Sequence, residues 1–455
     1  MIDLNKDTAL PLYERLYRQL REEIAAGKRQ GKLPSRRALA DQLGISLNTV
    51  DAAYRQLESE GFLEARPRSG FYVQSIHYPA TPAPYVETAP TPETKKTLTV
   101  DFAVGAVDEA LFPMGQWQKL TRACLNRPGV LSRSAPYGDL GLRLAIAEYL
   151  ARARGVHCLP EQVILGGGTD ALLRLVGRVL PEETAFVLEN PAYHRAYQDF
   201  SRLGHPVSPA QMDEKGIVPA CLAELDRAAV YTAPSHQYPL GFAMPMGRRT
   251  ELLAWCAGAP GRYLIEDDYD SEFRYDAKPL PSLQSIDRNG CVIYLGTMSG
   301  VVAPGLCISY LILPPTLLPR LEQEPYACNI STLSQYTLRE FMANGEFERH
   351  LNRMRVCYRN RSRTLRRLLA PYGSLTIYGE QAGSYLAVSY EGQEALCQRA
   401  QAFGVGVYPI EPYFMGQVPP AYRNTVLLGF GNLQEADMIR GVRLLEQAWG
   451  LKKQE

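Results

Sequence analysis

One stretch in the middle of the chain constrains its fold more than any other. Residues 262–273 read Arg-Tyr-Leu-Ile-Glu-Asp-Asp-Tyr-Asp-Ser-Glu-Phe, an apolar strand that ends abruptly in a cluster of carboxylates. In open α/β sheets, ligands bind in the crevice beyond the carboxyl ends of the strands. The stretch therefore predicts a strand buried in such a sheet, with Asp267 and its acidic neighbours at the edge where a ligand binds.

A second buried strand is predicted at residues 291–295, and it runs into a loop that contains glycine and serine, residues 296–305. Amphipathic helical segments alternate with short apolar strands from Val100 to the end of the chain. This alternation is typical of a mostly parallel sheet with helices on both faces. The main body is therefore predicted to be an α/β domain.

A glycine turn lies earlier in this body. The apolar residues 163–165 run into Gly166-Gly167-Gly168-Thr169, and a helix follows. The free backbone N–H groups at the start of a helix attract anions, phosphate above all. Gly168 and Thr169 are therefore candidate phosphate-binding residues.

The first 75 residues have a different pattern. Apolar side chains recur about every four positions over residues 12–24, which predicts an amphipathic helix. A short helix follows Ser35, another starts at Ser46, and two short strands, residues 62–66 and 70–73, flank a turn. Helix, glycine-containing turn and helix make a helix-turn-helix, and the strand pair makes a wing.

This block resembles the winged helix of GntR-type regulators from end to end. The matching residues are Leu33-Pro34-Ser35, Arg37, Asn48-Thr49-Val50, Gln56-Leu57, Glu60-Gly61 and Ser69-Gly70. The resemblance implies operator DNA as a partner, contacted by residues of the turn, the recognition helix and the wing: Lys32, Ser35, Arg36, Arg37, Ser46, Asn48, Thr49, Arg66, Arg68 and Gly70.

Charge alone does not decide for DNA binding, because residues 1–76 hold twelve basic and ten acidic side chains. The alternative reading is a solvated charged face. Leu47 and Asp51 depart from the family pattern, since many relatives carry arginine at these positions. An acidic side chain at residue 51 is expected to repel phosphate.

The two strand ends of the main body resemble the cofactor site of fold-type I aminotransferases, in the version carried by the MocR group of GntR-type regulators. The resemblance implies a pyridoxal phosphate site in which Asp267 pairs with the pyridine nitrogen. A Ser-Lys pair then ends the second strand, and its lysine forms the Schiff base. Ser299 fits, but Gly300 stands at the lysine position, and Cys307 stands where the family has arginine. Glycine has no amine, so pyridoxal phosphate is expected to bind noncovalently at most, or not at all.

The resemblance implies four further roles around this site. Tyr193 stacks on the cofactor ring, Tyr269 reaches its phenolic oxygen, and Arg195 lies near the carboxylate of the ligand. His236 lies in a loop beside the cofactor and is either a proton-transfer group or a structural histidine.

The patterns divide the chain into four parts. Residues 1–75 form the winged helix, 76–97 a proline-rich linker, 98–370 the aminotransferase-like large domain and 371–455 a small C-terminal α+β domain. A proline-rich spacer is extended and semi-rigid, so it can carry the head to a partner subunit. The resemblance implies a homodimer with a head-to-tail arrangement.

Periodicity predicts further elements within the main body. A helix is expected over residues 144–153, and a long helix around residues 349–367 is expected to turn its many arginines to solvent. Strands are expected over residues 386–388, 405–409 and 426–430.

The composition does not by itself identify a binding partner. The 49 lysines and arginines nearly balance the 48 aspartates and glutamates, so no chain-wide field attracts nucleic acid or membranes. Nine cysteines without a CxxC pair or metal-ligand spacing fit free thiols in a reducing compartment. The start is too charged for a signal peptide, and no apolar run reaches the roughly 18 residues of a membrane span. A cytoplasmic protein without a membrane partner is expected.

Functions of two classes fit the sequence. The first is a DNA-binding transcription regulator whose aminotransferase-like domain senses a small-molecule effector, pyridoxal phosphate or an amino-acid-like metabolite, and dimerises without transaminase turnover. The alternative is an active pyridoxal phosphate-dependent aminotransferase with a fused DNA-binding head, for which Lys278 is the nearest substitute amine. A third reading makes the core a dimerisation body that binds no ligand. A divalent-metal site formed by Asp268, Asp270 and Glu272 is the weaker reading of the acidic cluster, and no metal is expected.

Overall fold

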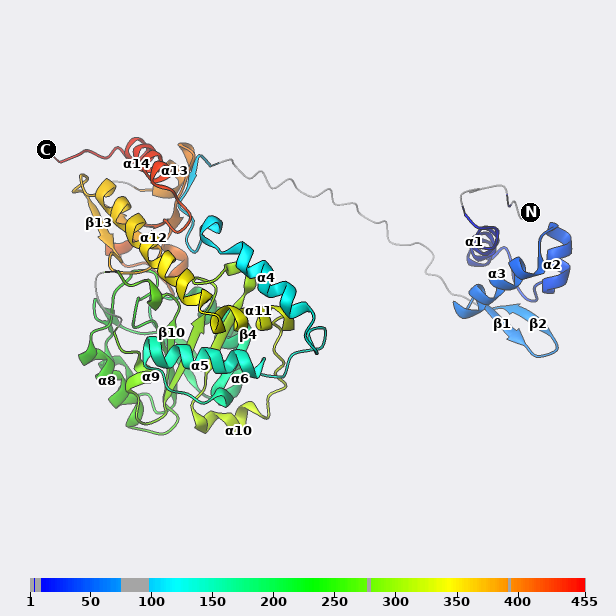
Figure 1. Cartoon of the computed structure of the whole chain (residues 1–455), viewed down its shortest axis with the longest axis horizontal. Helices are drawn as coiled ribbons and strands as arrows, with labels where there is room; N and C mark the ends of the chain where they lie inside the picture. Colours follow the sequence, from blue (N-terminus) through cyan, green and yellow to red (C-terminus); the bar gives the residue numbers. More distant parts are fainter. Residues whose placement is uncertain (1–3, 5–9, 75–97, 276–279, 392–393, 455) are drawn as a thin grey trace. The chain divides into compact units, whose positions relative to one another are not determined.

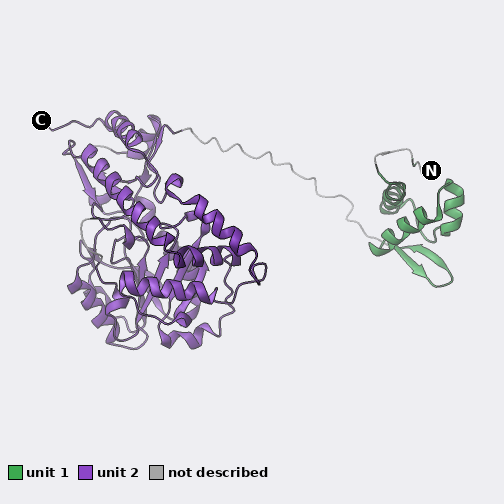
Figure 2. Cartoon of the chain, in the orientation of Figure 1, with its two compact units in different colours: residues 1–95 green, residues 96–455 purple. Residues whose placement is uncertain are grey.

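The computed structural model describes residues 4, 10–74, 98–275, 280–391 and 394–454 of the chain. These residues fall into two compact units, residues 1–95 and 96–455, each with its own hydrophobic core (Figure 2). The predicted linker, residues 76–97, lies outside the described residues. No helix in the described part of the chain is both long and apolar enough to cross a bilayer.

Unit 1 is a winged helix-turn-helix, as predicted (Figure 1). Its elements are α1 (Leu12–Ala25), α2 (Arg36–Leu43), α3 (Leu47–Ser59), β1 (Leu63–Arg66) and β2 (Gly70–Val73). The side chains of Ser35 and Ser46 cap α2 and α3 by accepting hydrogen bonds from the backbone N–H groups of Ala38 and Thr49. Gly44 ends α2 in the left-handed conformation, with a φ of 66°.

The core of unit 2 is one large sheet. Within the described residues, seven strands follow the order β4-β12-β11-β10-β9-β5-β6. Their bounds are β4 Val163–Gly167, β5 Ala185–Leu188, β6 Val207–Pro209, β9 Ala228–Thr232, β10 Tyr263–Asp268, β11 Val292–Thr297 and β12 Ile308–Ile312. Neighbouring strands are parallel except that β12 runs antiparallel to β11 and β4. The predicted mostly parallel α/β sheet is confirmed.

Helices cover both faces of this sheet because successive side chains of each buried strand point to opposite faces. Ile265 of β10 belongs to a core shared with α6 (Thr169–Val179), α7 (His194–Arg202) and α10 (Leu318–Leu321). Its neighbour Leu264 packs on the other face.

The helices of that other face are α8 (Met246–Ala257) and α9 (Leu283–Ile286), and α5 (Leu140–Arg154) covers its β4–β12–β11 side. Helix α5 begins before the predicted residue 144 because the carboxylate of Asp139 caps it by accepting from the N–H of Leu142. The other helices and hairpin of this part are α4 (Met114–Leu125), α11 (Thr332–Ala343), β7 (Met212–Asp213) and β8 (Gly216–Ile217).

A second sheet lies toward the C-terminus, in the order β13-β14-β17-β16. Its strands are β13 Leu375–Tyr378, β14 Tyr385–Tyr390, β16 Tyr408–Pro409 and β17 Thr425–Gly429, and its neighbouring helices are α12 (Glu346–Leu369), α13 (Leu396–Ala402) and α14 (Glu435–Trp449). The prediction of one strand over residues 405–409 was wrong. The chain changes partner at Val407, so β15 (Val405–Gly406) pairs with β3 (Val100–Asp101), and β16 pairs with β17.

The prediction that α12 turns its arginines to solvent was wrong for Arg361. This side chain is 6% exposed, and it donates hydrogen bonds to the carboxylate of Asp108 and to the carbonyl oxygen of Gly431. It lies on the apolar face of the helix with Tyr358 and Leu365, where a buried charge requires such partners.

A buried ion pair joins α5 to β10. Arg154 Nε lies 2.7 Å from Asp268 Oδ2, and the two side chains are 3% and 1% exposed. The same guanidinium donates to the hydroxyl of Ser235 at 2.8 Å and to the carbonyl oxygen of Leu280 at 3.0 Å. Arg154 therefore connects a helix, a strand and two loops.

We expect Arg154→Met to destabilise unit 2 strongly, because it leaves the Asp268 carboxylate buried without its cation, at a cost of about 3–5 kcal/mol. Arg152→Met is the matched control. It breaks a pair with Glu348 whose side chains are 69% and 43% exposed, and such pairs contribute less than about 1 kcal/mol. Urea unfolding followed by tryptophan fluorescence measures this, because Trp117, Trp255 and Trp449 all lie in unit 2. Equal losses in both variants would contradict a special role of Arg154.

Candidate functional site

Unit 1 presents the start of α3 as its candidate DNA-reading surface. The hydroxyls of Ser46 and Thr49 lie 2.8 Å apart, so each already has a partner. Asn48 beside them is exposed, and its side chain has no bonded partner within the described part of unit 1. In helix-turn-helix proteins, residues at this end of the recognition helix reach base edges. Asn48 is the side chain that is free to do so here.

The predicted phosphate-contacting residues surround this helix end. Ser35 is engaged as the cap of α2, whereas Arg37 is exposed. Gly70 of the wing has a φ of 106°, and a Cβ placed there would lie 3.4 Å from Lys32 Cε. The structure thus brings Lys32 and the wing together.

The two wing arginines differ in how they are held. Arg66 pairs with Glu64 at 3.0 Å and lies over the ring of Tyr72, 4.4 Å from its centroid. Arg68 at the turn is exposed, with a φ of 61°. Arg68 therefore has more freedom to follow a phosphate than Arg66.

The carboxylate of Asp51 is paired with two arginines. Its Oδ1 accepts a hydrogen bond from Arg36, and its Oδ2 lies 2.9 Å from the guanidinium of Arg55. The Arg36 guanidinium also lies 5.4 Å from the centroid of the Phe71 ring. Asp51 therefore neutralises and orients two arginines next to the reading surface. Arg55 was missed from the sequence, although its i,i+4 spacing from Asp51 on a helix pointed to the pair.

In unit 2 the predicted cofactor residues gather around the end of β10. Asp267 is 8% exposed and accepts a hydrogen bond from the hydroxyl of Tyr231. Burial raises the pKa of Asp267 to about 7, against the opposing effect of the Tyr231 hydrogen bond. Asp267 is thus a buried acid whose hydrogen-bond partner, among the described residues, is a hydroxyl and not a cation.

The glycine turn leads into α6 as predicted, and its first turn carries a charge. Gly168 has a φ of 94°, and a Cβ there would meet nothing within 4 Å among the described residues. Asp170 follows Thr169, and its carboxylate accepts from Tyr193 Oη at 2.8 Å and from Arg195 at 2.6 Å. The predicted stacking residue and the predicted carboxylate-binding residue are therefore both bound to Asp170. The sequence did not predict Asp170 as a site residue, because the prediction for this turn rested only on its backbone N–H groups.

Tyr269 belongs to a different cluster. Its hydroxyl lies 2.9 Å from His236 Nδ1 and 3.1 Å from Tyr385 Oη, and the same His236 nitrogen lies 2.7 Å from Asp270 Oδ2. His236 is buried, and its Nε2 has no partner among the described residues. Burial raises the pKa of Asp270, and the neighbouring His236 opposes that shift.

The loop after β11 contains the two departures from the family pattern. Ser299 donates its N–H to Thr297 Oγ1 at 3.1 Å. A Cβ at Gly300 would meet the carbonyl oxygen of Tyr269 at 3.7 Å and no other described atom within 4 Å. Cys307 is exposed, with a φ of 47°, and its thiol lies 3.3 Å from the carbonyl oxygen of Pro304. The structure therefore leaves space beside Gly300, and the position of Cys307 carries no charge.

The other carboxylates of the acidic cluster have separate protein partners. Asp268 pairs with Arg154, Asp270 with His236, and Glu272 accepts a hydrogen bond from Tyr149 at 3.0 Å. Across the described residues, no three potential ligands converge on one point in a metal-binding arrangement.

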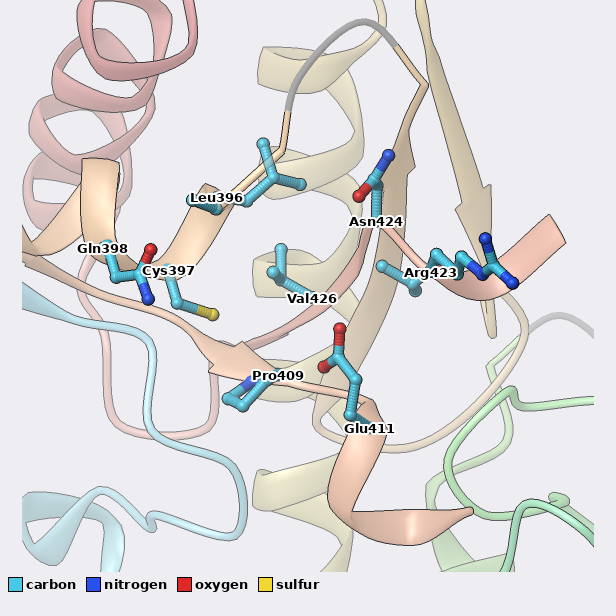
Figure 3. Close-up of a pocket in the computed structure, with 10 residues that line it drawn as sticks. Leu396, Cys397, Gln398, Pro409, Glu411, Arg423, Asn424 and Val426 are labelled. Atoms are coloured by element: carbon cyan, nitrogen blue, oxygen red, sulfur yellow. The ribbon is translucent and has the colours of Figure 1, made fainter. Parts of the chain in front are cut away.

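A depression of about 280 Å³ lies on the second sheet, away from these residues in sequence. Figure 3 shows Cys397, Glu411 and Val426 facing one another across it, whereas the guanidinium of Arg423 points away. Burial and the Glu411 carboxylate raise the pKa of the Cys397 thiol to about 11. The thiol is therefore protonated at neutral pH and is a weak nucleophile.

The arrangement around Asp267 fits one part of pyridoxal phosphate and not the rest. Asp267 can bind a protonated ring nitrogen, and a planar ring can pack on Tyr193. Gly300 offers no amine to an aldehyde, and Cys307 offers no cation to a phosphate. Lys278, the substitute amine considered from the sequence, lies outside the described residues. The described residues can hold a planar ring without a covalent bond, and the role of each remains a prediction.

Comparison with known proteins relates each unit to a known family or fold. Residues 12–73 match the family model described as "Bacterial regulatory proteins, gntR family". Unit 2 resembles solved aminotransferases. The structure of LysN, the alpha-aminoadipate aminotransferase of Thermus thermophilus, complexed with N-(5'-phosphopyridoxyl)-L-leucine, matches with a TM-score of 0.69 and 28% identity, over 78% of this chain and 92% of that one.

Several curated relatives match over nearly the whole chain, among them one from Bacillus subtilis and one from Rhizobium meliloti. The "Uncharacterized HTH-type transcriptional regulator YdeL" of Bacillus subtilis is 38% identical, over 98% of this chain and 98% of its own length. The "Probable rhizopine catabolism regulatory protein MocR" of Rhizobium meliloti is 32% identical, over 99% of this chain and 96% of its own length. Both units together, in this order, are therefore shared with these proteins.

We expect Asp51→Asn to reduce sequence discrimination more than overall DNA affinity, because Arg36 and Arg55 lose the carboxylate that orients them. The ratio of affinities for a selected site and for random DNA should fall about tenfold, within the 1–3 kcal/mol of one bidentate base contact. Fluorescence anisotropy with a site selected from a random pool measures both affinities.

Arg37→Ala is the comparison variant, and it should weaken binding to both DNAs alike and flatten the salt dependence. A discrimination ratio unchanged in Asp51→Asn would refute the orienting role of Asp51. An unchanged salt slope in Arg37→Ala would remove Arg37 from the phosphate contacts.

The stability of unit 2 should fall as the pH rises through the range in which Glu272 titrates. Burial raises the pKa of Glu272 from 4.5 to about 7. The folded state therefore holds this proton more tightly than the unfolded state, and that stabilisation is lost between about pH 4.5 and 7. Glu272→Gln, which cannot ionise, should lose less Tm than the wild type between about pH 5 and 8. Identical pH profiles of Tm would contradict this assignment.

Proposed function

Since this chain belongs to the MocR group of GntR-type transcription regulators, we propose that its unit 1 binds operator DNA and its aminotransferase-like unit 2 senses a small-molecule effector. Unit 2 binds any pyridoxal phosphate without a covalent bond and does not turn over amino acids. The observation that carries this proposal is Gly300, at the position after β11 where the family resemblance requires the Schiff-base lysine.

The head supports the DNA-binding half of the proposal. The gntR family model spans its helices and wing, and both helix caps of the helix-turn-helix are formed. Asn48 is exposed at the start of α3, and Asp51 holds two guanidinium groups beside it. These are the side-chain types that read bases and phosphates.

The core supports the sensing half. Asp267 and Tyr193 supply a ring site, while Gly300 and Cys307 replace the amine and the cation that the family resemblance places there. When bound, pyridoxal phosphate supplies an electron sink to an enzyme, but that use requires a lysine to hold it and to move protons. A site that binds without reacting suits a sensor.

The assembly and compartment belong to the same proposal. We place the large domain at residues 98–370, the small domain at 371–455 and the linker at 76–97. The protein acts as a cytoplasmic homodimer with a head-to-tail arrangement. The effector is pyridoxal phosphate or an amino-acid-like metabolite, and Arg195 contacts its carboxylate. Gly168, Thr169, Tyr193, Asp267, Tyr269 and Ser299 form the binding site.

An enzyme is the competing candidate. It needs an amine in place of Gly300, and Lys278 precedes β11 in sequence instead of following it. The full-length similarity to transcription regulators favours the sensor over this candidate.

Treatment with pyridoxal phosphate and borohydride, followed by intact-mass measurement and peptide mapping, distinguishes the two functions. The wild type should show no site-specific adduct. Gly300→Lys combined with Cys307→Arg should capture one coenzyme per chain, because the space beside Gly300 admits a side chain. The single variant Cys307→Arg is the control and should capture none.

A stoichiometric adduct in the wild type, with turnover of an amino acid, would overturn the proposal in favour of the enzyme. Failure of the full-length protein to select any DNA sequence from a random pool would overturn its DNA-binding half.

A further inference from the structure

The disagreement between this site and pyridoxal phosphate indicates what the site does bind. The inference rests on the proposed sensing function and concerns the same residues. The site has three regions: the end of β10, which would face a ring nitrogen, the first turn of α6, which would face a phosphate, and the loop after β11, which would face an aldehyde.

The ring-nitrogen end of the site is intact. Asp267 is buried at the end of β10, and it has a neutral hydroxyl partner in Tyr231. The charged groups that act on it electrostatically, Asp268 and Asp270, are both acidic. A buried carboxylate in such surroundings is stabilised by a cationic N–H donor, which a protonated ring nitrogen supplies.

The flat face of the site is also preserved. Tyr193 is half-buried beside the core of the α6 face, and its hydroxyl is fixed by the hydrogen bond to Asp170. A tyrosine ring held in this way is a rigid surface for a planar ligand. Tyr193 packs against the same hydrophobic cluster as Tyr231, whose hydroxyl donates to Asp267, so the ring of Tyr193 and the carboxylate of Asp267 lie on the same side of the sheet.

The phosphate end carries an acidic side chain. Helix N-termini favour anions, but Asp170 places a carboxylate in the first turn of α6. The cation beside this turn is Arg195, and its guanidinium is bound to that carboxylate at 2.6 Å. The charge of Arg195 is therefore already matched by Asp170. A phosphate placed near Gly168 would meet a carboxylate and an arginine that is already paired.

The loop after β11 adds nothing to compensate for this. Gly300 supplies neither an amine nor a charge, and Cys307 supplies a thiol in place of a guanidinium. The positions that would bind the aldehyde and the phosphate have both lost their cation, while the ring position has kept its anion.

From this contrast we infer that the effector of this site is a planar nitrogen heterocycle that is protonated at its ring nitrogen and carries no phosphate group. Asp267 binds the nitrogen, Tyr193 packs on the ring, and the Asp170–Arg195 pair excludes a phosphoryl substituent.

Isothermal titration of the full-length protein with pyridoxine and with pyridoxal phosphate tests the inference. Both probes contain the same substituted pyridine ring, and pyridoxal phosphate has a phosphate and an aldehyde where pyridoxine has a hydroxyl and a hydroxymethyl group. Pyridoxine should bind at least about tenfold more tightly, the size expected when one charge-assisted contact is replaced by a repulsive one. Asp267→Asn should weaken pyridoxine binding about tenfold or more.

Two opposite substitutions separate the charge effect from misfolding. Asp170→Asn frees Arg195 and should raise the affinity for pyridoxal phosphate, whereas Arg195→Gln leaves Asp170 unpaired and should lower it. The opposite signs of these two changes distinguish the charge effect from a general loss of structure, which would lower both affinities. Glu183→Gln, which breaks the exposed pair with Arg227, is the control and should change neither ligand.

Tighter binding of pyridoxal phosphate than of pyridoxine by the wild type would overturn the inference. Absence of pyridoxine binding by a protein that still binds DNA would also overturn it. Neither result touches the proposed function, which fails instead on a covalent adduct with turnover or on the loss of DNA selection.

Discussion

The alternation of side chains along one buried strand determines how unit 2 is built and what its site can bind. Asp267 and Asp268 are neighbours at the end of β10, so they point to opposite faces of the sheet. Asp268 faces α5 and is neutralised by Arg154, which secures that helix and two loops. Asp267 faces the side of Tyr231 and has no ion pair with a cation in the described part of the chain. One residue of register thus separates a carboxylate in a buried ion pair from the carboxylate that we propose binds the effector.

Much of the fold could be predicted because local sequence specifies it. Ser35 and Ser46 precede apolar helical patterns, and both cap their helices as expected. The strands at residues 263–268 and 292–297 are continuous apolar runs, which buried parallel strands require. The single strand expected over 405–409 failed because pairing with β3 is a long-range choice that the local sequence does not show.

The site was harder to predict, since its charges are set by contacts between distant elements. The i,i+4 spacing of Asp51 and Arg55 on a helix is enough to indicate their ion pair. The ion pair between Asp51 and Arg36 of α2 depends on how two helices pack. Asp170 meets Tyr193 and Arg195 only when α6 and α7 lie side by side. Arg361 was expected in solvent, because a helix rich in arginine gives no sign of which one is buried. Sequence gives the residue types, and tertiary contacts decide which charges remain available.

The short parallel pair of β3 and β15 has a mechanical consequence. The described chain enters unit 2 at Leu98, and two residues later it pairs in parallel with Val405 and Gly406, next to the second sheet and not within the seven-stranded one. The point where the described chain enters unit 2 therefore lies on the part that carries β13–β17, and a displacement of that part relative to the seven-stranded sheet moves this entry point with it.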